Sequence, residues 1–230
     1  MKITKIAVLL QKFKKVNSQA SISEKDNDYW NEFYKENNVP NKSSSFAKSV
    51  LELIDKKKSL IELGCGNGRD SFFFARNGVE TIGVDLSAKA IELNNSFNHA
   101  NVKFQNGDFT KLHELPSKNI GSIYSRFTLH SIDKKSYDRV LNWCSNVIKP
   151  GMKFFIEART VNDPLFGVGE SVGNNGFITS HYRRFLIIQD VIKELEEKYC
   201  FNIISAIEDW TSSWYKDDHA VVLRIICEKK

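Results

Sequence analysis

The chain has 230 residues, 41% of them hydrophobic and 27% charged, which is typical of globular proteins and not of disordered or fibrous ones. Residues 1–16 hold five lysines and no acid, and the remaining 28 basic residues balance 28 acidic ones, so the charge does not indicate a nucleic-acid partner. The apolar run at residues 6–10 is far too short to span a membrane. The four cysteines are widely separated in the sequence, which is typical of proteins of the reducing cytoplasm and not of a zinc site.

The first predicted elements precede any sheet. Residues 1–28 are expected to form an N-terminal arm, with a short amphipathic helix followed by a polar linker. An aromatic helix is expected to open at Asp28, and residues 43–45 are expected to cap a helix that extends through Ile54. A single domain is therefore expected over residues 29–230.

From residue 59 onward, short apolar runs alternate with helical patterns, which is typical of a parallel sheet covered on both faces. The expected strands are residues 59–63, 79–84, 102–105, 119–125 and 152–158. The expected helices between them are residues 69–77, 87–96 and 134–148. The pattern predicts an α/β fold.

Residues 160–185 interrupt this alternation with four glycines and exceed the length of a passive connector, so they are expected to form a functional or mobile cap. A helix is expected from Phe185. Two apolar β-runs, residues 201–207 and 220–227, are expected to pair as an antiparallel hairpin at one end of the sheet.

The most informative motif is Glu62-Leu63-Gly64-Cys65-Gly66-Asn67-Gly68-Arg69, in which an apolar strand leads into three alternate glycines. Glycine lets the backbone turn tightly and lets a ligand approach closely. Open α/β sheets bind ligands at this end of their strands. A dinucleotide fingerprint would need a third glycine where Arg69 stands, and an arginine there suits a ligand carboxylate.

Acidic residues end the next two strands. Asp85 is expected to accept both hydroxyls of a ribose, while Ser87 caps the helix that follows. Asp108, in Asn106-Gly107-Asp108-Phe109, is expected to accept a hydrogen bond from an exocyclic amine. The ring of Phe109 then offers a face to an adenine.

In their order and spacing, these motifs resemble the class I S-adenosylmethionine-dependent methyltransferases over roughly residues 40–230. The resemblance implies a Rossmann-like, mainly parallel seven-stranded sheet with an antiparallel terminal hairpin. It also implies S-adenosylmethionine as cofactor, S-adenosylhomocysteine as product, and no metal. The cofactor-binding residues that it implies are Glu62, Gly64, Cys65, Gly66, Arg69, Asp70, Asp85, Leu86, Ser87, Gly107, Asp108, Phe109 and Ser125.

Three further segments, residues 125–131, 157–159 and 181–185, resemble a bacterial subgroup associated with surface-polysaccharide biosynthesis, including the O-methyl phosphoramidate decoration of capsules. This resemblance implies O-methylation of a small anionic or carbohydrate-linked acceptor. Methylation of another small molecule or a metalloid is an alternative. A nicotinamide-dependent oxidoreductase, a nucleic-acid-modifying protein and a non-catalytic cofactor sensor are less favoured functions.

Several basic residues are candidates for the acceptor side of the site. His130 follows the fourth strand and is a candidate base for a hydroxyl acceptor, or only a partner of the backbone. An anionic acceptor would need no base, and His130 with the arginines would then only position it. The cationic group at residues 181–184 is expected just before a helix. The candidate catalytic residues are Arg126, His130, Arg159, His181, Arg183 and Arg184.

Two aromatic groups have open roles. Tyr29, Trp30, Phe33 and Tyr34 are expected to form a lid over the cofactor or simply to pack in the core. The second group, on the terminal hairpin, is expected to line the pocket or to form a homodimer contact. Its members are Trp210, Trp214 and Tyr215.

Overall fold

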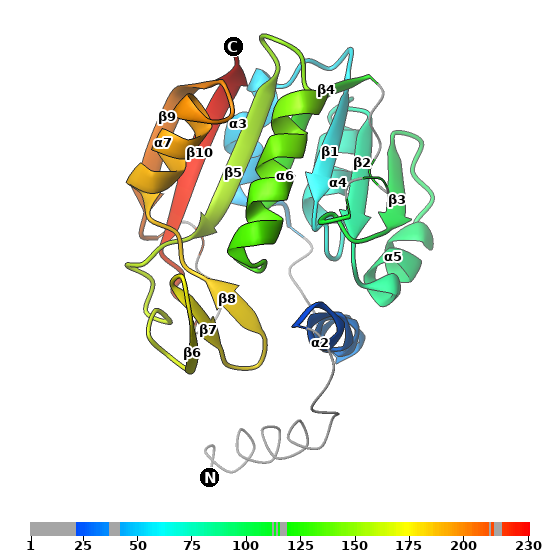
Figure 1. Ribbon diagram of the computed structural model, residues 1–230. Coiled ribbons are helices and arrows are strands. Elements are labelled where there is room, and N and C mark those ends of the chain that lie inside the picture. The colour runs from blue at the N-terminus through cyan, green and yellow to red at the C-terminus, as the bar shows by residue number, and fades with distance from the viewer. Residues whose placement is uncertain are drawn as a thin grey trace.

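The structure is a computed structural model that describes residues 22–36, 42–111, 113, 115, 119–211, 213 and 218–230. Its main sheet has seven strands in the order β3-β2-β1-β4-β5-β10-β9 (Figure 1). The first five strands are parallel, and β10 runs antiparallel to both β5 and β9. Their bounds are β1 Ser59–Leu63, β2 Thr81–Asp85, β3 Val102–Asn106, β4 Ile120–Arg126, β5 Lys153–Arg159, β9 Phe201–Asp209 and β10 Val222–Lys229.

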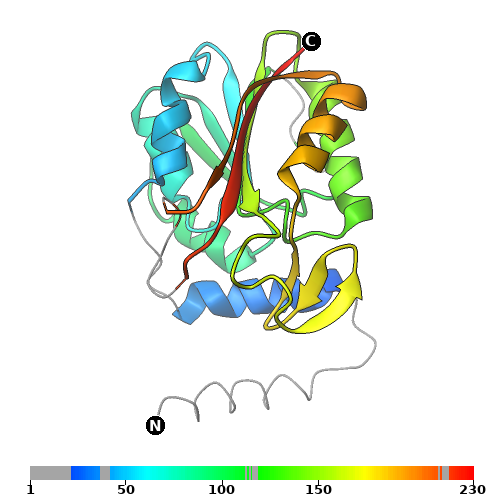
Figure 2. The ribbon, with the colours of Figure 1, turned by 90° about the vertical axis from the view of Figure 1, so that its left-hand side faces the viewer.

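This sheet confirms the predicted fold class, and each observed strand bound of the first five lies within two residues of its prediction. The interior strand β1 is buried along its whole length, because helices cover both faces (Figure 2). One apolar core lies between the sheet and α6 with α7, and a second lies between the sheet and α3 with α4. The helices are α3 Ser45–Val50, α4 Arg69–Arg76, α5 Ala88–Asn95, α6 Lys134–Val147 and α7 Ile188–Glu197.

Ser44 caps α3 as predicted, since its hydroxyl accepts from the backbone N–H of Ala47 at 2.9 Å. The expected helix through Ile54 is shorter than predicted, because α3 ends at Val50 and a 3-10 turn, η1 (Leu51–Leu53), follows. The cap Ser44 also lies beside the glycine turn, which makes α3 part of the support of the site.

Residues 170–184, expected as part of a mobile cap, form a small antiparallel sheet instead of a loop. Its strands are β6 Glu170–Gly173, β7 Gly176–Ile178 and β8 Tyr182–Arg184. Asn174 and Asn175 both have positive φ (52° and 57°), which suits the two-residue turn of a hairpin. The residues 181–184 therefore end in a strand and not at the start of a helix, which begins only at Ile188.

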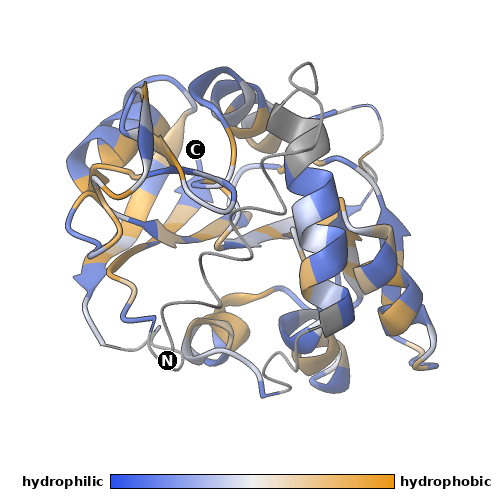
Figure 3. Cartoon of the chain, turned by 90° about the horizontal axis from the view of Figure 1, so that it is seen from below, coloured by the Kyte–Doolittle hydropathy of each residue, from blue (hydrophilic) through white to orange (hydrophobic). Residues whose placement is uncertain are grey.

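Helix α2 (Ile22–Glu36) begins six residues before the predicted start, so the end of the expected arm is helical. Residues 1–21 of that arm lie outside the described residues. Helix α2 lies across the carboxyl-end edge of the sheet (Figures 2 and 3). Three polar contacts hold it: Asn31 accepts from the hydroxyl of Ser87 at 2.8 Å and from the N–H of Lys89 at 3.3 Å, and Asp26 accepts from the N–H of Tyr182 at 3.4 Å. No helix in the described ranges is long and apolar enough to cross a membrane.

Candidate active site

A cavity of about 600 Å³ opens at the carboxyl ends of the parallel strands. Its walls come from α2, the glycine turn after β1, the loops after β2 to β5, and the cap sheet. All four aromatic residues of the expected lid line it. The predicted site residues that also line it are Glu62, Gly64, Cys65, Gly66, Arg69, Asp70, Asp85, Leu86, Asp108, Phe109, Arg126, His130, Arg159, His181 and Arg183.

Four predicted site residues do not line the cavity: Ser87, Gly107, Ser125 and Arg184. Ser87 instead caps α5 by accepting from Ala90 N–H at 3.2 Å, and Gly107 donates its N–H to the carbonyl of Asp85 at 2.9 Å. The sequence thus places Ser87 and Gly107 in the loops that form the site, where their contacts support the walls of the cavity.

The glycine turn adopts the backbone conformation that its three glycines allow. Gly64, Gly66 and Gly68 all have positive φ, at 69°, 53° and 71°. At Gly64 a Cβ would lie 1.9 Å from Thr128 Cγ2, and at Gly66 a Cβ would lie 2.2 Å from the hydroxyl of Tyr34. The glycines therefore let both the loop after β4 and helix α2 approach the turn.

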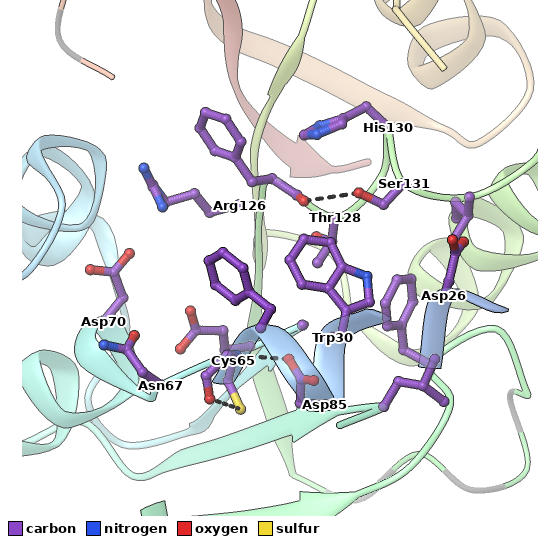
Figure 4. A pocket seen from close by; sticks show the side chains of 18 of the residues that line it. Asp26, Trp30, Cys65, Asn67, Asp70, Asp85, Arg126, Thr128, His130 and Ser131 are labelled. Atoms are coloured by element: carbon purple, nitrogen blue, oxygen red, sulfur yellow. Dashed lines mark hydrogen bonds between the residues drawn. The ribbon is translucent and has the colours of Figure 1, made fainter. Parts of the chain in front are cut away.

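Asp85 connects this turn to the loop after β2. Its Oδ2 accepts from Gly66 N–H at 2.7 Å, and its Oδ1 accepts from Ser87 N–H at 2.9 Å. Burial raises the pKa of Asp85 above its usual range, although the two N–H donors oppose the shift. Each carboxylate oxygen of Asp85 can accept one more hydrogen bond. Figure 4 shows Asp85 and Cys65 at one end of the cavity, with His130 at the other.

Glu62 and Asp70 contact other protein groups and hold the turn from behind. Glu62 accepts from the hydroxyl of Ser71, and burial, with the charge of Asp70, raises the pKa of Glu62 well above its usual range. Asp70 accepts from the N–H and the hydroxyl of Ser44 at 2.7 and 2.8 Å and from Tyr124 Oη at 3.0 Å. Glu62 thus holds the first turn of α4, and Asp70 holds the cap of α3, roles that the sequence does not indicate.

Asp108 and Phe109 lie together in the loop after β3. The Oδ1 of Asp108 accepts from the N–H and the hydroxyl of Thr110 at 2.9 and 2.7 Å, which fixes the carboxylate at the cavity wall. Phe109 is buried and faces the same space. The pair has the carboxylate and the aromatic surface that the sequence predicts there.

Phe127, which the sequence analysis does not single out, follows β4 with a φ of 58°. A bulky residue in this conformation costs about 1–3 kcal/mol, and such strain is typical of functional sites. Its ring lies 4.6 Å from the guanidinium of Arg126 and 5.3 Å from that of Arg159. The strained backbone therefore places an aromatic ring between two cations at the cavity wall.

The arginines differ in how their charges are compensated. Arg126 Nε lies 2.8 Å from Glu157 Oε1, and Arg159 forms ion pairs with Asp163 and Asp218. Arg183 donates to the hydroxyl of Thr179 at 2.7 Å but has no carboxylate ion pair in the described part of the chain. Burial, and then the charge of Arg159, lower the pKa of Arg183.

Arg184 does not belong to this wall. Alternate residues of a strand point to opposite sides, so Arg184 on β8 turns away from Arg183. Its guanidinium lies 4.3 Å from the ring centre of Tyr137 on α6, and it does not line the cavity. Its candidate catalytic role, which assumed a helix start at this place, is not supported by the structure.

The two histidines are both buried. His130 is 3% exposed, and its Nδ1 accepts from the backbone N–H of Arg159 at 3.3 Å. Burial, with the nearby charge of Arg159, lowers the pKa of His130 well below its usual range. His181 packs between Tyr29 and Trp30 of α2, with ring centres 4.4 and 4.9 Å away, so it joins the cap to the lid.

Helix α2 carries one titratable group that responds near neutral pH. Burial raises the pKa of Asp26 from 3.8 to about 6, against the opposing effects of Tyr182 N–H and Arg183. Between pH 3.8 and about pH 6, the Asp26 carboxyl is mostly protonated when helix α2 is docked and mostly ionised in the unfolded chain. The free energy that favours docking of α2 therefore falls as the pH rises through this window. We therefore expect amides of α2 to be better protected from hydrogen exchange, after correction for intrinsic rates, at pH 5 than at pH 7.

The matched variant is Asp26→Asn, which keeps an acceptor oxygen for Tyr182 N–H but does not titrate. Its α2 amides should show the same protection at both pH values. Equal protection at pH 5 and 7 in the parent protein would contradict the assignment.

The second aromatic group does not contribute to the cavity as far as it is described. Trp210 is 53% exposed and is not among the residues that line the cavity. Trp214 and Tyr215 lie outside the described residues, and a homodimer stays a prediction. Within the described ranges, no cluster of three or more His, Cys, Asp or Glu side chains could hold a metal ion.

Comparison with known proteins agrees with this arrangement. Residues 60–151 match the sequence model of a family described as a methyltransferase domain. No curated protein has a sequence that matches the chain significantly.

Solved structures of several methyltransferases share the fold. A SAM-dependent methyltransferase from Anabaena variabilis is 17% identical, with 92% of this chain and 96% of that chain covered and a TM-score of 0.69. The 1,6-didemethyltoxoflavin-N1-methyltransferase of Burkholderia thailandensis, solved with S-adenosylhomocysteine, is 14% identical, with 94% and 98% covered and a TM-score of 0.66. The glycopeptide N-methyltransferase MtfA, solved with the same product, is 15% identical, with 86% and 91% covered and a TM-score of 0.63.

At these identities the structural likeness shows the fold, and residues 60–151 are similar in sequence to a methyltransferase domain. The chain thus has the Rossmann-like fold of the solved S-adenosylmethionine-dependent methyltransferases.

Proposed function

We propose that this protein transfers the methyl group of S-adenosylmethionine to an oxygen atom of a small anionic acceptor. The observation that carries the proposal is the division of one cavity into two chemically different ends. One end holds the glycine turn and Asp85, and the other holds His130 with Arg159 and Arg183 close to it. Its volume of about 600 Å³ lies in the range of small-molecule sites.

The residues at the first end fit the nucleoside part of the cofactor. Asp85 presents carboxylate oxygens to the cavity and is suited to accept from the hydroxyls of a ribose. Asp108 and Phe109 supply an acceptor and an aromatic face for the adenine. Arg69, at the start of α4, lines the cavity and suits the carboxylate of the methionine part.

The bound cofactor supplies a methyl group already activated by a positively charged sulfur. An acceptor oxygen held in the cavity would take this methyl group as the carbon–sulfur bond breaks, and the electron pair of that bond would stay on the sulfur of S-adenosylhomocysteine. The protein's own work is to orient the acceptor and to exclude water, which in favourable cases supplies about 7–11 kcal/mol. The aromatic side chains of α2 close the cavity on one side and serve the second task.

For the acceptor we propose a phosphorylated, phosphoramidate-containing or nucleotide-linked sugar compound of surface-polysaccharide biosynthesis. The support for this class is the sequence resemblance of residues 125–131, 157–159 and 181–185, together with the cations at the second end. Arginine forks match phosphate-like oxygens in geometry and charge.

The test begins with calorimetry of the full chain against S-adenosylmethionine, S-adenosylhomocysteine and NADH. We expect both sulfur compounds to bind with a Kd below about 100 µM and NADH to give no heat. Release of S-adenosylhomocysteine is then measured with phosphoramidates, nucleotide-linked sugars and free polyols. Binding of NADH alone would overturn the proposal in favour of an oxidoreductase. Cofactor binding without turnover of any acceptor would favour a non-catalytic sensor.

A further inference from the structure

The His130 imidazole is held in one orientation from several sides. Its ring packs edge-on against Phe127 at a centre distance of 5.4 Å. Its own backbone carbonyl accepts from Arg184 N–H at 2.6 Å, which ties the loop after β4 to the cap strand β8. With 3% of its surface exposed, the ring has little freedom to flip.

This orientation assigns the ring protons. Nδ1 accepts from Arg159 N–H at 3.3 Å, and a backbone N–H can only donate, so Nδ1 carries a lone pair. Burial and the charges of Arg159, Arg183, His181 and Arg184 lower the pKa of His130 well below its usual range, so the ring is neutral at pH 7. A neutral imidazole with a bare Nδ1 carries its proton on Nε2.

The Nε2–H group has no hydrogen-bond partner within the described chain, although His130 lines the cavity. A protonated Nε2 donates one hydrogen bond and cannot accept a second proton. The other nitrogen is covered by Arg159 N–H. His130 in this arrangement is therefore a donor toward the cavity and not a base.

A neighbouring group on the same wall makes this donor useful. Arg183 lines the cavity close enough for its charge to affect His130, and no carboxylate of the described chain pairs with it. A guanidinium and an N–H donor facing one space suit an oxygen that is already negative, and neither group can take a proton from a hydroxyl.

We propose that His130 binds the acceptor as a fixed Nε2–H donor beside Arg183, and that the methyl-accepting group is an oxyanion ionised before the reaction. The acceptor class is a small oxyacid, for which inorganic phosphate is the probe, and His130 does not act as a base on it. This inference rests on the proposed methyl transfer, but its tests have readouts that do not depend on turnover.

The first test is nitrogen NMR of the full chain labelled with ¹⁵N-histidine and bound to S-adenosylhomocysteine. The chain has five histidines, and His130→Gln identifies the signals of His130 by their loss. We expect a proton on Nε2, none on Nδ1, and no change between pH 6 and 8. A proton on Nδ1, or a titration in this range, overturns the proposal.

The second test compares two variants that both lose the Nδ1 acceptor. His130→Gln keeps a terminal N–H donor near the position of Nε2, and His130→Leu keeps the approximate volume without any donor. Binding of inorganic phosphate to the complex with S-adenosylhomocysteine is measured by calorimetry. We expect His130→Leu to weaken phosphate binding by about 10- to 100-fold and His130→Gln by a clearly smaller factor.

Equal losses in the two variants, or no phosphate binding to the parent complex, overturn the proposal. Affinity for S-adenosylhomocysteine is recorded for all three proteins, and we expect it to agree within about threefold. If the parent chain binds neither S-adenosylhomocysteine nor S-adenosylmethionine, the proposed function itself fails, and the two failures are therefore distinguishable.

Discussion

Substitution of Gly64 by alanine is expected to lower the free energy of unfolding by about 3 kcal/mol, as measured by urea denaturation. Two effects add. The residue has a φ of 69°, a conformation that costs an L-residue about 1–2 kcal/mol. The new Cβ would also lie 1.9 Å from Thr128 Cγ2, and overpacking of this kind typically costs about 1–3 kcal/mol.

Two controls separate the backbone strain from the collision. Gly78 has a φ of 83°, but no atom lies within 4 Å of its virtual Cβ, so Gly78→Ala should lose only the strain term. In the background Thr128→Ser, which removes Cγ2 and keeps the hydroxyl bonded to Ser125 at 2.6 Å, Gly64→Ala should recover part of the loss. If Gly64→Ala and Gly78→Ala are equally destabilising, close approach of the two loops is not what requires glycine.

The second large effect is expected at Asp85. Asp85→Ala should raise the Kd for S-adenosylmethionine by about 100-fold, since a charged acceptor contributes about 1.5–3 kcal/mol per hydrogen bond. The substitution also removes the acceptor that holds Gly66 N–H at 2.7 Å, so the turn loses its anchor. Calorimetry gives the affinity, and thermal unfolding shows how much of the chain remains folded.

The matched control is Asp138→Ala, which also removes one acid but disrupts contacts with Lys134 and Tyr199, away from the cavity. Its affinity for S-adenosylmethionine should stay within about threefold of the parent. An Asp85→Ala protein that binds as tightly as the parent would contradict the role of the carboxylate.

The parts of the site that follow directly from local sequence could be predicted. Apolar runs bounded by glycine or proline locate the parallel strands, and their carboxyl ends converge on one edge of the sheet. This is why the glycine turn, Asp85 and Asp108 are found together around one cavity. These residues meet at the cavity because each one follows a parallel strand, and contacts between distant parts of the sequence are not needed to bring them together.

The parts that depend on distant packing could not be predicted. Asp70 is engaged by Ser44 and Tyr124, which are 26 and 54 residues away in the sequence. Nothing local distinguishes such an acid from one that faces a ligand. The positive φ of Phe127 is likewise set by its surroundings, because no bulky residue prefers that conformation.

One element that was not predicted, the hairpin of the cap sheet, does have a local signal in the sequence. Gly173-Asn174-Asn175-Gly176 contains the asparagines that tolerate a two-residue hairpin turn, and this turn predicts the strands on either side of it. With β8 recognised as a strand, the opposite directions of Arg183 and Arg184 follow from the pleat.

For the proposed methyl transfer, the docking of helix α2 has a consequence for the rate of turnover. Its aromatic side chains line one wall of the cavity, and contacts through Asp26, Asn31 and His181 join it to both the cap and α5. In the proposed reaction, S-adenosylhomocysteine would leave after these contacts open, and movements of this kind occur on the microsecond to millisecond scale. We expect departure of the product to limit the turnover number, so that added viscogen slows the steady state more than a single turnover.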